Sequence, residues 1–183
     1  MRKILRKKFF EQPTLMVAEN LLGKFLVRDG RTFMITEVEA YDGFEDKASH
    51  ASRGETPRNK VMFGEAGVWY VYFVYGMHHM LNIVTGAEGY PAAVLIRGIE
   101  GISGPARLTK SLGIDWQMNE QKAIHASGLW IEDRGIIIPK NRIERTPRIG
   151  VAYAGEEWAG KPWRFCIKDR YLNHDKFSSP ENR

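Results

Sequence analysis

Met34-Ile-Thr-Glu-Val-Glu-Ala-Tyr41 has the alternation and the β-branched content of a strand. Because side chains alternate between the two faces of a strand, one face would carry Met34, Thr36, Val38 and Ala40, and the other Ile35, Glu37, Glu39 and Tyr41. The first face suits a hydrophobic core. The second presents two carboxylates and a phenol, which a solvated edge of an antiparallel sheet would also explain.

A second stretch, Trp69-Tyr-Val-Tyr-Phe-Val-Tyr-Gly-Met77, adds an unusual density of aromatic side chains. The core of a protein of this size does not require so many rings. Aromatic faces attract cations, and a carboxylate attracts them too. The two stretches together therefore favour a site for a flat, cationic ligand held over an acid.

The remaining sequence predicts short helices and further strands. Asp29-Gly30 is a two-residue hairpin signal, and Gly23, Gly76 and Gly113 each end a predicted element. Residues 42–60 are polar and rich in turn residues, which predicts a long surface loop with short helical pieces near 45–51 and from 57. Helices are expected over 13–22, from 104 to 113 and over 117–127, and strands over 24–28, 68–75, 80–85, 92–97, 129–131, 136–138, 149–153 and 164–168.

No repeat, linker or change of composition divides the chain. We therefore expect one domain over residues 1–183, with a frayed tail over about 173–183. The predicted fold class is α+β: a bent, mostly antiparallel β-sheet with surrounding short helices and a protruding β-hairpin.

Composition narrows the class of partner and the compartment. The formal charge is +5 and the pI is about 9.3, which permits a polyanionic partner such as nucleic acid without demonstrating one. Cys166 is the only cysteine, so the chain has no internal disulfide, and we expect an intracellular, cytoplasmic protein without a membrane span. The histidines lack ligand spacing with acidic or cysteine partners, so no metal site is predicted.

Several short motifs follow one another in an order that resembles a known family. They are Glu37-Val-Glu39-Ala-Tyr41, Asp46-Lys-Ala-Ser-His50, Thr56-Pro-Arg-Asn59, Tyr70-Val-Tyr72, Tyr75-Gly-Met77, Asn82 and Gly104-Pro105. As an ordered set they resemble the alkyladenine (3-methyladenine) DNA glycosylase family, and the likeness extends from Phe9 to Phe165. The resemblance implies a monomeric, monofunctional base-excision repair enzyme that acts on duplex DNA with damaged purines and needs no cofactor.

The resemblance also implies a reaction. A damaged purine such as 3-methyladenine or 7-methylguanine is flipped out of the duplex, and water activated by a glutamate hydrolyses its N-glycosidic bond. The range of substrates stays open for neutral lesions such as hypoxanthine or ethenoadenine, because they need protonation of the base, for which the sequence names no residue.

The same resemblance assigns roles in the base pocket. Glu39 corresponds to the general base, and Arg97 to a residue that helps orient the acid or the water. The other matched positions contact the flipped base: Tyr41 and Tyr72 stack on it, His50 forms a wall that hydrogen-bonds it, and Asn82 obstructs the amino group of normal guanine.

DNA contacts outside the pocket follow from the resemblance and from the basic residues. Tyr75 matches the wedge that fills the gap left by the flipped base, and Met77 would line the wedge region. The start of the helix at Gly104 is the strongest single candidate for a phosphate contact. The basic candidates for backbone contacts are Arg53, Arg58, Lys60, Arg107, Lys110, Arg145 and Arg148.

Alternatives remain at this stage. Glu37 shares a face with Glu39, so the residues alone do not choose between them as the base. A non-catalytic protein that binds damaged or distorted DNA would keep Tyr75 and the basic surface without needing an ionised Glu39. A glycosidase of nucleosides or sugars would use the two glutamates as a carboxylate pair, about 7 Å apart along the strand.

Overall fold

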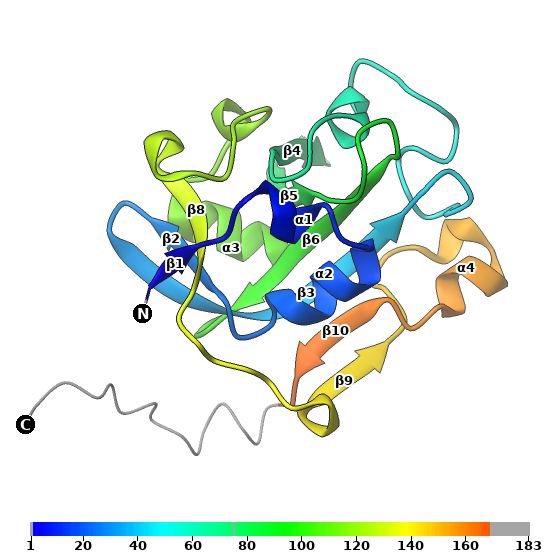
Figure 1. The fold of residues 1–183 in the computed structure, drawn as a ribbon. Helices are drawn as coiled ribbons and strands as arrows, with labels where there is room; N and C mark the ends of the chain where they lie inside the picture. Colours follow the sequence, from blue (N-terminus) through cyan, green and yellow to red (C-terminus); the bar gives the residue numbers. More distant parts are fainter. Residues whose placement is uncertain (1, 75, 169–183) are drawn as a thin grey trace, which may run out of the picture.

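The computed structural model describes residues 2–74 and 76–168, and a curled antiparallel sheet dominates it (Figure 1). The long strand β3 (Arg31–Asp42) lies at the centre of the sheet. On one edge, the first part of β3 pairs with β2 (Phe25–Arg28) and its later part pairs with β10 (Arg164–Ile167). On the other edge, β3 pairs with β6 (Ala92–Ile99). The strand order is β1-β8-β2-β3-β6-β5-β4. The predicted α+β class is confirmed.

Short strands and helices complete the described fold. The remaining strands are β1 (Lys3–Ile4), β4 (Trp69–Val74), β5 (His78–Val84), β7 (Ile102–Ser103), β8 (Leu129–Asp133) and β9 (Ile143–Thr146). The α-helices are α1 (Lys7–Phe10), α2 (Thr14–Leu21), α3 (Pro105–Leu112) and α4 (Glu156–Gly160). Single 3₁₀ turns lie at Lys60–Phe63, Trp116–Met118, His125–Ser127, Lys140–Arg142 and Ala152–Ala154.

Helix signals in the sequence locate α2 and α3. Pro105 occupies the start of α3, and Gly113 ends it in the left-handed conformation with φ of 60°. In α2 an apolar stripe is buried, while Pro13 caps the helix instead of forming its first turn as expected. The two helices pack against the sheet, α2 on β3 and α3 on β5.

Burial along β3 differs from the simple two-face expectation. Val38 and Ala40 are fully buried, as predicted for the core face, but Ile35 and Glu39 on the other face are also 0 % exposed. β3 is paired on both edges, and segments from elsewhere in the chain cover both of its faces. Glu39 therefore does not lie on a solvated sheet edge.

The predicted helix over 117–127 is wrong. Two separate 3₁₀ turns flank an extended segment that lies along the edge of β4. There the Trp69 amide donates to the Gln121 carbonyl at 2.8 Å, and the Ala123 amide donates to Gly67 at 2.8 Å. A helix would leave this strand edge unpaired, and pairing the edge outweighs local helix propensity.

Two predicted strands are also absent. Residues 136–138 have no regular structure, and Ile136 and Ile138 pack closely against Gly23. Residues 149–153 lead into a 3₁₀ turn between Gly150 and Gly155, whose φ values of 78° and 83° interrupt an extended strand. The short strand β9 was not predicted, and the region 45–51 forms turns instead of a helical piece.

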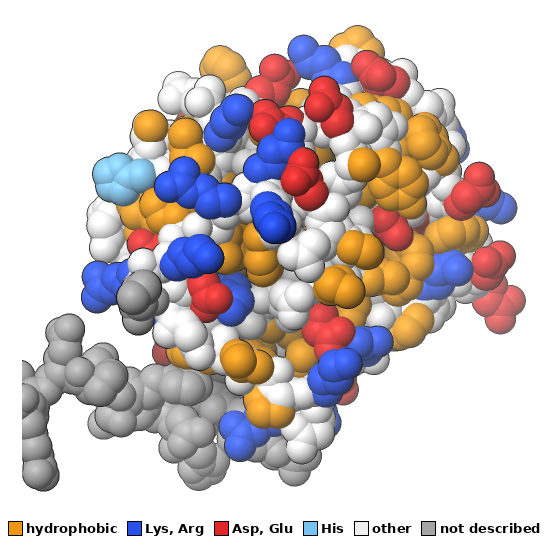
Figure 2. Space-filling model, in the orientation of Figure 1, with side chains coloured by type: hydrophobic (Ala, Val, Ile, Leu, Met, Phe, Trp, Pro, Cys, Tyr) orange, Lys and Arg blue, Asp and Glu red, His pale blue; other side chains and the backbone are white. Residues whose placement is uncertain are grey.

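Charged and hydrophobic side chains are interspersed on the face seen in Figure 2, and hydrophobic ones gather over and beside α2. A concavity of about 810 Å³ opens between α2, residues 136–140 and Trp163, with a largely apolar lining. Its lining includes Arg145, one of the basic candidates for DNA-backbone contacts, but none of the residues predicted to form the base pocket.

Candidate active site

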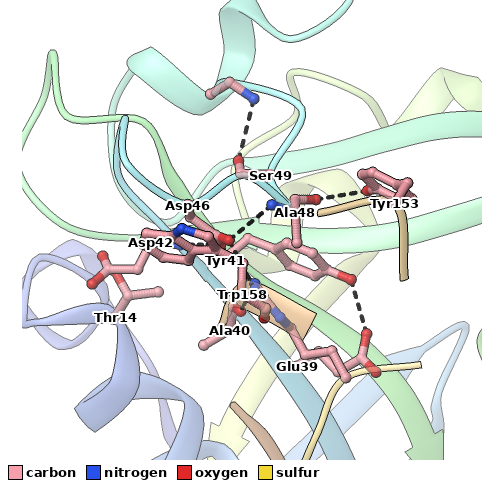
Figure 3. Close-up of polar contacts among 12 residues, drawn as sticks. Thr14, Glu39, Ala40, Tyr41, Asp42, Asp46, Ala48, Ser49, Tyr153 and Trp158 are labelled. Atoms are coloured by element: carbon pink, nitrogen blue, oxygen red, sulfur yellow. Dashed lines mark hydrogen bonds and ion pairs between the residues drawn. The ribbon is translucent and has the colours of Figure 1, made fainter. Parts of the chain in front are cut away.

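Glu39 is buried completely and its carboxylate is held from three directions. The Tyr41 hydroxyl donates to Oε2 at 2.9 Å (Figure 3), and the Ile149 backbone amide donates to Oε1 at 2.8 Å. Arg97 Nη1 lies 3.5 Å from the same Oε1. As the alternation of β3 predicts, Glu39 and Tyr41 point to the same side of the strand.

The surroundings of Glu39 pull its pKa in opposite directions. Burial raises the pKa of this carboxyl, and this is the largest effect. Arg97, the Ile149 amide and the Tyr41 hydroxyl each lower it, while the nearby Glu37 raises it. The net pKa is above the ordinary value for glutamic acid, so this carboxyl holds its proton to a higher pH than an exposed glutamate does.

Glu37 lies in a different environment from Glu39. Its Oε1 accepts from Arg97 Nε at 3.0 Å and from Arg164 Nη1 at 2.8 Å. The register of β3 against β6 shifts at Glu37, and Gly98 opposite leaves room for it: a Cβ there would lie 3.0 Å from the Glu37 Cβ. Glu37 lines a concavity beside Gly98 and Arg164, whereas Glu39 meets Tyr41 at the aromatic pocket.

Four of the predicted base-contacting residues line one pocket: Tyr41, His50, Tyr72 and Asn82. The rest of its wall comes from Tyr70 and Tyr153 and from the smaller or aliphatic residues Ala48, Ser49, Met62 and Ala93. The cavity between them is about 40 Å³. Because a water molecule needs roughly 10–15 Å³ of such space, the pocket has room for a few waters and must widen to admit a purine.

His50 is held against two tyrosines of β4. Its Nδ1 lies 3.0 Å from the Tyr70 hydroxyl, and its ring meets the edge of Tyr72 with centroids 4.5 Å apart. Burial lowers the pKa of His50, and the charge of Arg58 lowers it further. Burial raises the pKa of Tyr70 to about 12, so at neutral pH the pocket wall consists of a neutral imidazole and protonated phenols.

Asn82 is buried on β5, directly across from Tyr70 on β4. Its side-chain amide donates to the Tyr70 carbonyl at 3.1 Å and to the Met80 carbonyl at 3.2 Å. The two bonds fix the orientation of this side chain in the wall of the pocket.

Arg148 is a site residue whose role the sequence did not reveal. It was expected among the phosphate contacts, but its side chain is 0 % exposed, so that expectation is wrong. Its guanidinium forms a two-nitrogen ion pair with Asp46, at 2.6 and 2.8 Å, and donates to the Ala40 carbonyl at 2.9 Å. The sequence motif that contains Asp46 was the available signal for this ion pair, but the sequence alone does not show which basic residue pairs with Asp46.

The hairpin of β4 and β5 carries the predicted wedge region. The strands pair as far as Val74 and His78, and Met77 at the turn is 66 % exposed. Tyr75, the predicted wedge itself, lies outside the described residues. Arg58 is exposed beside this hairpin, where it donates to the Phe73 carbonyl at 3.1 Å.

The other basic candidates lie on the surface. Arg107 and Lys110 are exposed on α3, which packs against the strand that carries Asn82, and Gly104 caps that helix with φ of 96°. Lys60 forms an exposed ion pair with Glu120 at 3.3 Å. Arg145 pairs with Glu19 at 2.6 Å.

Two features are absent from residues 2–74 and 76–168. No group of three or more His, Cys, Asp or Glu side chains in that part of the chain is arranged to hold a metal ion. No helix there is long and apolar enough to cross a membrane.

Comparison with known proteins identifies the family to which the sequence is similar. The model of the family described as methylpurine-DNA glycosylase (MPG) matches residues 8–103 and 100–171. A protein of Methanocella arvoryzae named "Putative 3-methyladenine DNA glycosylase" is 44 % identical over 190 residues, covering 91 % of this chain and 93 % of its own length. Proteins with the same name from Myxococcus xanthus (43 % identical, 90 % of each chain) and Wolbachia pipientis wPip (45 %, 90 % and 91 %) are similarly close.

The chain belongs to the methylpurine-DNA glycosylase family. It is a DNA glycosylase, a hydrolase of glycosyl bonds, and the resemblance inferred from the ordered motifs is confirmed.

Proposed function

We propose that this glycosylase flips an alkylated purine out of duplex DNA into the pocket between Tyr41 and Tyr72, and hydrolyses its glycosidic bond with water activated by Glu39. The observation that carries the proposal is the fully buried Glu39 carboxylate, hydrogen-bonded to Tyr41 at the wall of an aromatic pocket. A base has to leave the stack before its sugar bond can be reached, at a cost of a few kcal/mol.

The pocket favours a cationic base. Alkylation at a ring nitrogen makes a purine positive, and the faces of Tyr41 and Tyr72 gain about 0.5–2 kcal/mol with a cation over a neutral ring. His50 does not oppose this preference, because its lowered pKa keeps the imidazole neutral at neutral pH. Asn82, whose side chain is fixed by two hydrogen bonds to backbone carbonyls, would obstruct the amino group of normal guanine.

Hydrolysis then depends on the charge of Glu39. A cationic purine is a good leaving group, and its departure leaves an oxocarbenium-like sugar that an ionised carboxylate stabilises. The same carboxylate takes the proton of the attacking water. Arg97 supports the ionised form, since it lowers a pKa that burial raises. This chemistry needs no covalent enzyme intermediate.

The closed pocket implies movement when the base enters. Tyr153 is 70 % exposed at the pocket wall, and its hydroxyl donates to the Ala48 carbonyl at 2.9 Å (Figure 3). The segment that carries it is bounded by Gly150 and Gly155, both with positive φ. Displacement of this side chain would widen the pocket without disturbing the core.

Contacts with the duplex complete the proposal. Tyr75, together with the exposed Met77 at the turn between β4 and β5, would fill the space left by the flipped base, which offsets part of the unstacking cost. Arg58, Lys60, Arg107, Lys110 and the Gly104 end of α3 would contact phosphates, and we propose that the enzyme acts as a monomer.

Incubation with a duplex that holds a single 7-methylguanine tests the function. We expect release of the free base and an abasic site in an unbroken strand, with rates that fall steeply as salt rises. Tight binding of the damaged duplex without base release would instead support the non-catalytic binder. Hydrolysis of free nucleosides at rates independent of DNA and salt would support the small-molecule glycosidase.

A further inference from the structure

Arg148 and Asp46 form an ion pair that is buried completely, with both side chains 0 % exposed. Burying two charges is expensive, and replacing such a pair by apolar side chains is often neutral or stabilising. Stability alone therefore gives a weak reason for this pair. Its contacts suggest a different reason, because they reach three parts of the active site.

The first connection runs to the Glu39 carboxylate through the backbone. The amide that donates to Glu39 Oε1 belongs to the peptide bond between Arg148 and Ile149. Since that peptide is planar, the placement of Arg148 sets the direction of the Ile149 N–H. A guanidinium bonded to Asp46, to the Ala40 carbonyl and to the Trp158 carbonyl leaves little freedom for this segment.

The second connection runs to the pocket wall. The Arg148 guanidinium lies 4.8 Å from the centroid of the Tyr41 ring and 5.0 Å from that of Trp163. It therefore contacts two aromatic rings and supports the Tyr41 ring through a cation–π contact. The bond to the Ala40 carbonyl fixes the backbone between Glu39 and Tyr41 as well.

The third connection runs to the loop that carries His50. Asp46 accepts from the backbone amides of Asp42 at 3.2 Å and Ala48 at 3.1 Å, which holds the start of this loop on the end of β3. The Ala48 carbonyl in turn accepts from Tyr153. Figure 3 shows Asp46 and Ala48 beside Tyr41, with Tyr153 on the far side of Ala48.

We infer that Arg148, paired with Asp46, is a positioning residue for base excision: it aligns the Ile149 amide on Glu39 and the Tyr41 ring in the pocket. This inference rests on the proposed role of Glu39. Arg148 itself touches neither the base nor DNA in this account. Its loss should slow the chemical step much more than it weakens binding to DNA.

The test compares Arg148→Lys with the wild type. Lysine keeps the charge but cannot bond two Asp46 oxygens and the Ala40 carbonyl together, and it has no planar group to stack on an aromatic ring. With enzyme in excess over a duplex bearing one 7-methylguanine, we expect the single-turnover excision rate to fall at least tenfold. Affinity for an undamaged duplex of the same sequence should stay within about threefold.

Arg134→Lys is the matched control. Arg134 also bonds a carboxylate through two nitrogens, to Glu132 at 3.1 and 3.0 Å, and lies 4.7 Å from the Phe25 ring, but on strand β8 and the adjoining loop. The excision rate of Arg134→Lys should stay within about twofold of the wild-type rate, because the same chemical change is made away from the base pocket.

A double variant, compared with its two single variants, separates positioning from folding. Arg148→Met combined with Asp46→Asn removes both charges together, which avoids leaving one buried charge without its partner. If the two residues act as a unit, the excision rates of the double variant and of each single variant should fall by about the same factor. If they acted independently, the loss in the double variant would be the product of the two single losses. All rates are measured at least 10 °C below each variant's Tm.

The outcomes are distinct. A wild type that releases no base refutes the proposed function, whatever Arg148 does. A wild type that releases base, with Arg148→Lys and the double variant both folded and within threefold of its rate, overturns the positioning role. The positioning role would also be overturned if the excision rate of Arg148→Lys and its affinity for undamaged DNA fell by the same factor. If Arg148→Lys does not fold, the double variant decides.

Discussion

Replacing Tyr41 by phenylalanine separates two functions that this side chain could serve. The ring would stack on the base, while the hydroxyl donates to Glu39 Oε2 at 2.9 Å. That hydrogen bond favours the ionised carboxylate and lowers the pKa of Glu39. A hydrogen bond to a charged group contributes about 1.5–3 kcal/mol, which corresponds to roughly a 10- to 150-fold change in an equilibrium constant.

The direction of the effect follows from the role of the base. Losing the hydroxyl adds to the rise that burial already causes in the pKa of Glu39. Because a general base works only when deprotonated, the acid limb of the pH–rate profile moves to higher pH. On that limb the rate of Tyr41→Phe should fall by about 10- to 100-fold, while on the alkaline plateau it should stay within about threefold because the ring remains.

Single-turnover excision of 7-methylguanine from duplex DNA, followed across the pH range, measures both regions of the profile. Tyr72→Phe is the control, because it removes a phenol hydroxyl from the same pocket while leaving the hydrogen bond to Glu39 in place. Profiles of Tyr41→Phe and wild type that superimpose would refute the link between this hydroxyl and the ionisation of Glu39. An equal loss at every pH would show that the hydroxyl acts on some step other than deprotonation.

Three further substitutions test other parts of the account. Asn82→Ser should raise release of normal guanine from undamaged duplex by about tenfold or more, because a smaller side chain admits the amino group; unchanged guanine release would remove this residue from discrimination. Arg97→Met removes a charge that lowers the pKa of Glu39, so the acid limb should move to higher pH, and a shift to lower pH would contradict the assignment. Arg107→Gln should reduce the slope of log affinity against log salt by about 0.9 if this residue contacts a phosphate; an unchanged slope would place it away from DNA.

Local signals in the sequence predicted the strands that build the site. The alternation in 34–41 places Glu39 and Tyr41 on one side of β3, and the structure joins them by a hydrogen bond. Glycine and proline located the ends of α3, and glycine located the turns between β2 and β3 and between β4 and β5, because these residues restrict or extend the accessible backbone angles. Such features depend on neighbouring residues, so the sequence shows them directly.

Features that depend on distant partners could not be predicted in the same way. Residues 117–127 follow the edge of β4, and nothing within the segment reveals that edge. The Glu39 carboxylate accepts a hydrogen bond from Ile149, which is 110 residues away, and the buried Arg148 pairs with Asp46, 102 residues away. Most arginines in proteins are exposed to solvent, so the sequence predicts an exposed charge at Arg148. Only the fold shows that Arg148 is buried and paired.

Exchange of Glu39 for glutamine tests the central assignment most directly. Glutamine keeps the shape, and its carbonyl can accept from the Ile149 amide while its NH₂ group donates to the Tyr41 oxygen. Arg97 retains its bond to Glu37, so the variant should fold and bind damaged duplex normally. The account predicts release of free 7-methylguanine by the wild type and a rate at least 100-fold lower for Glu39→Gln. Release within tenfold of the wild type would contradict it and move the base elsewhere, to Glu37 first.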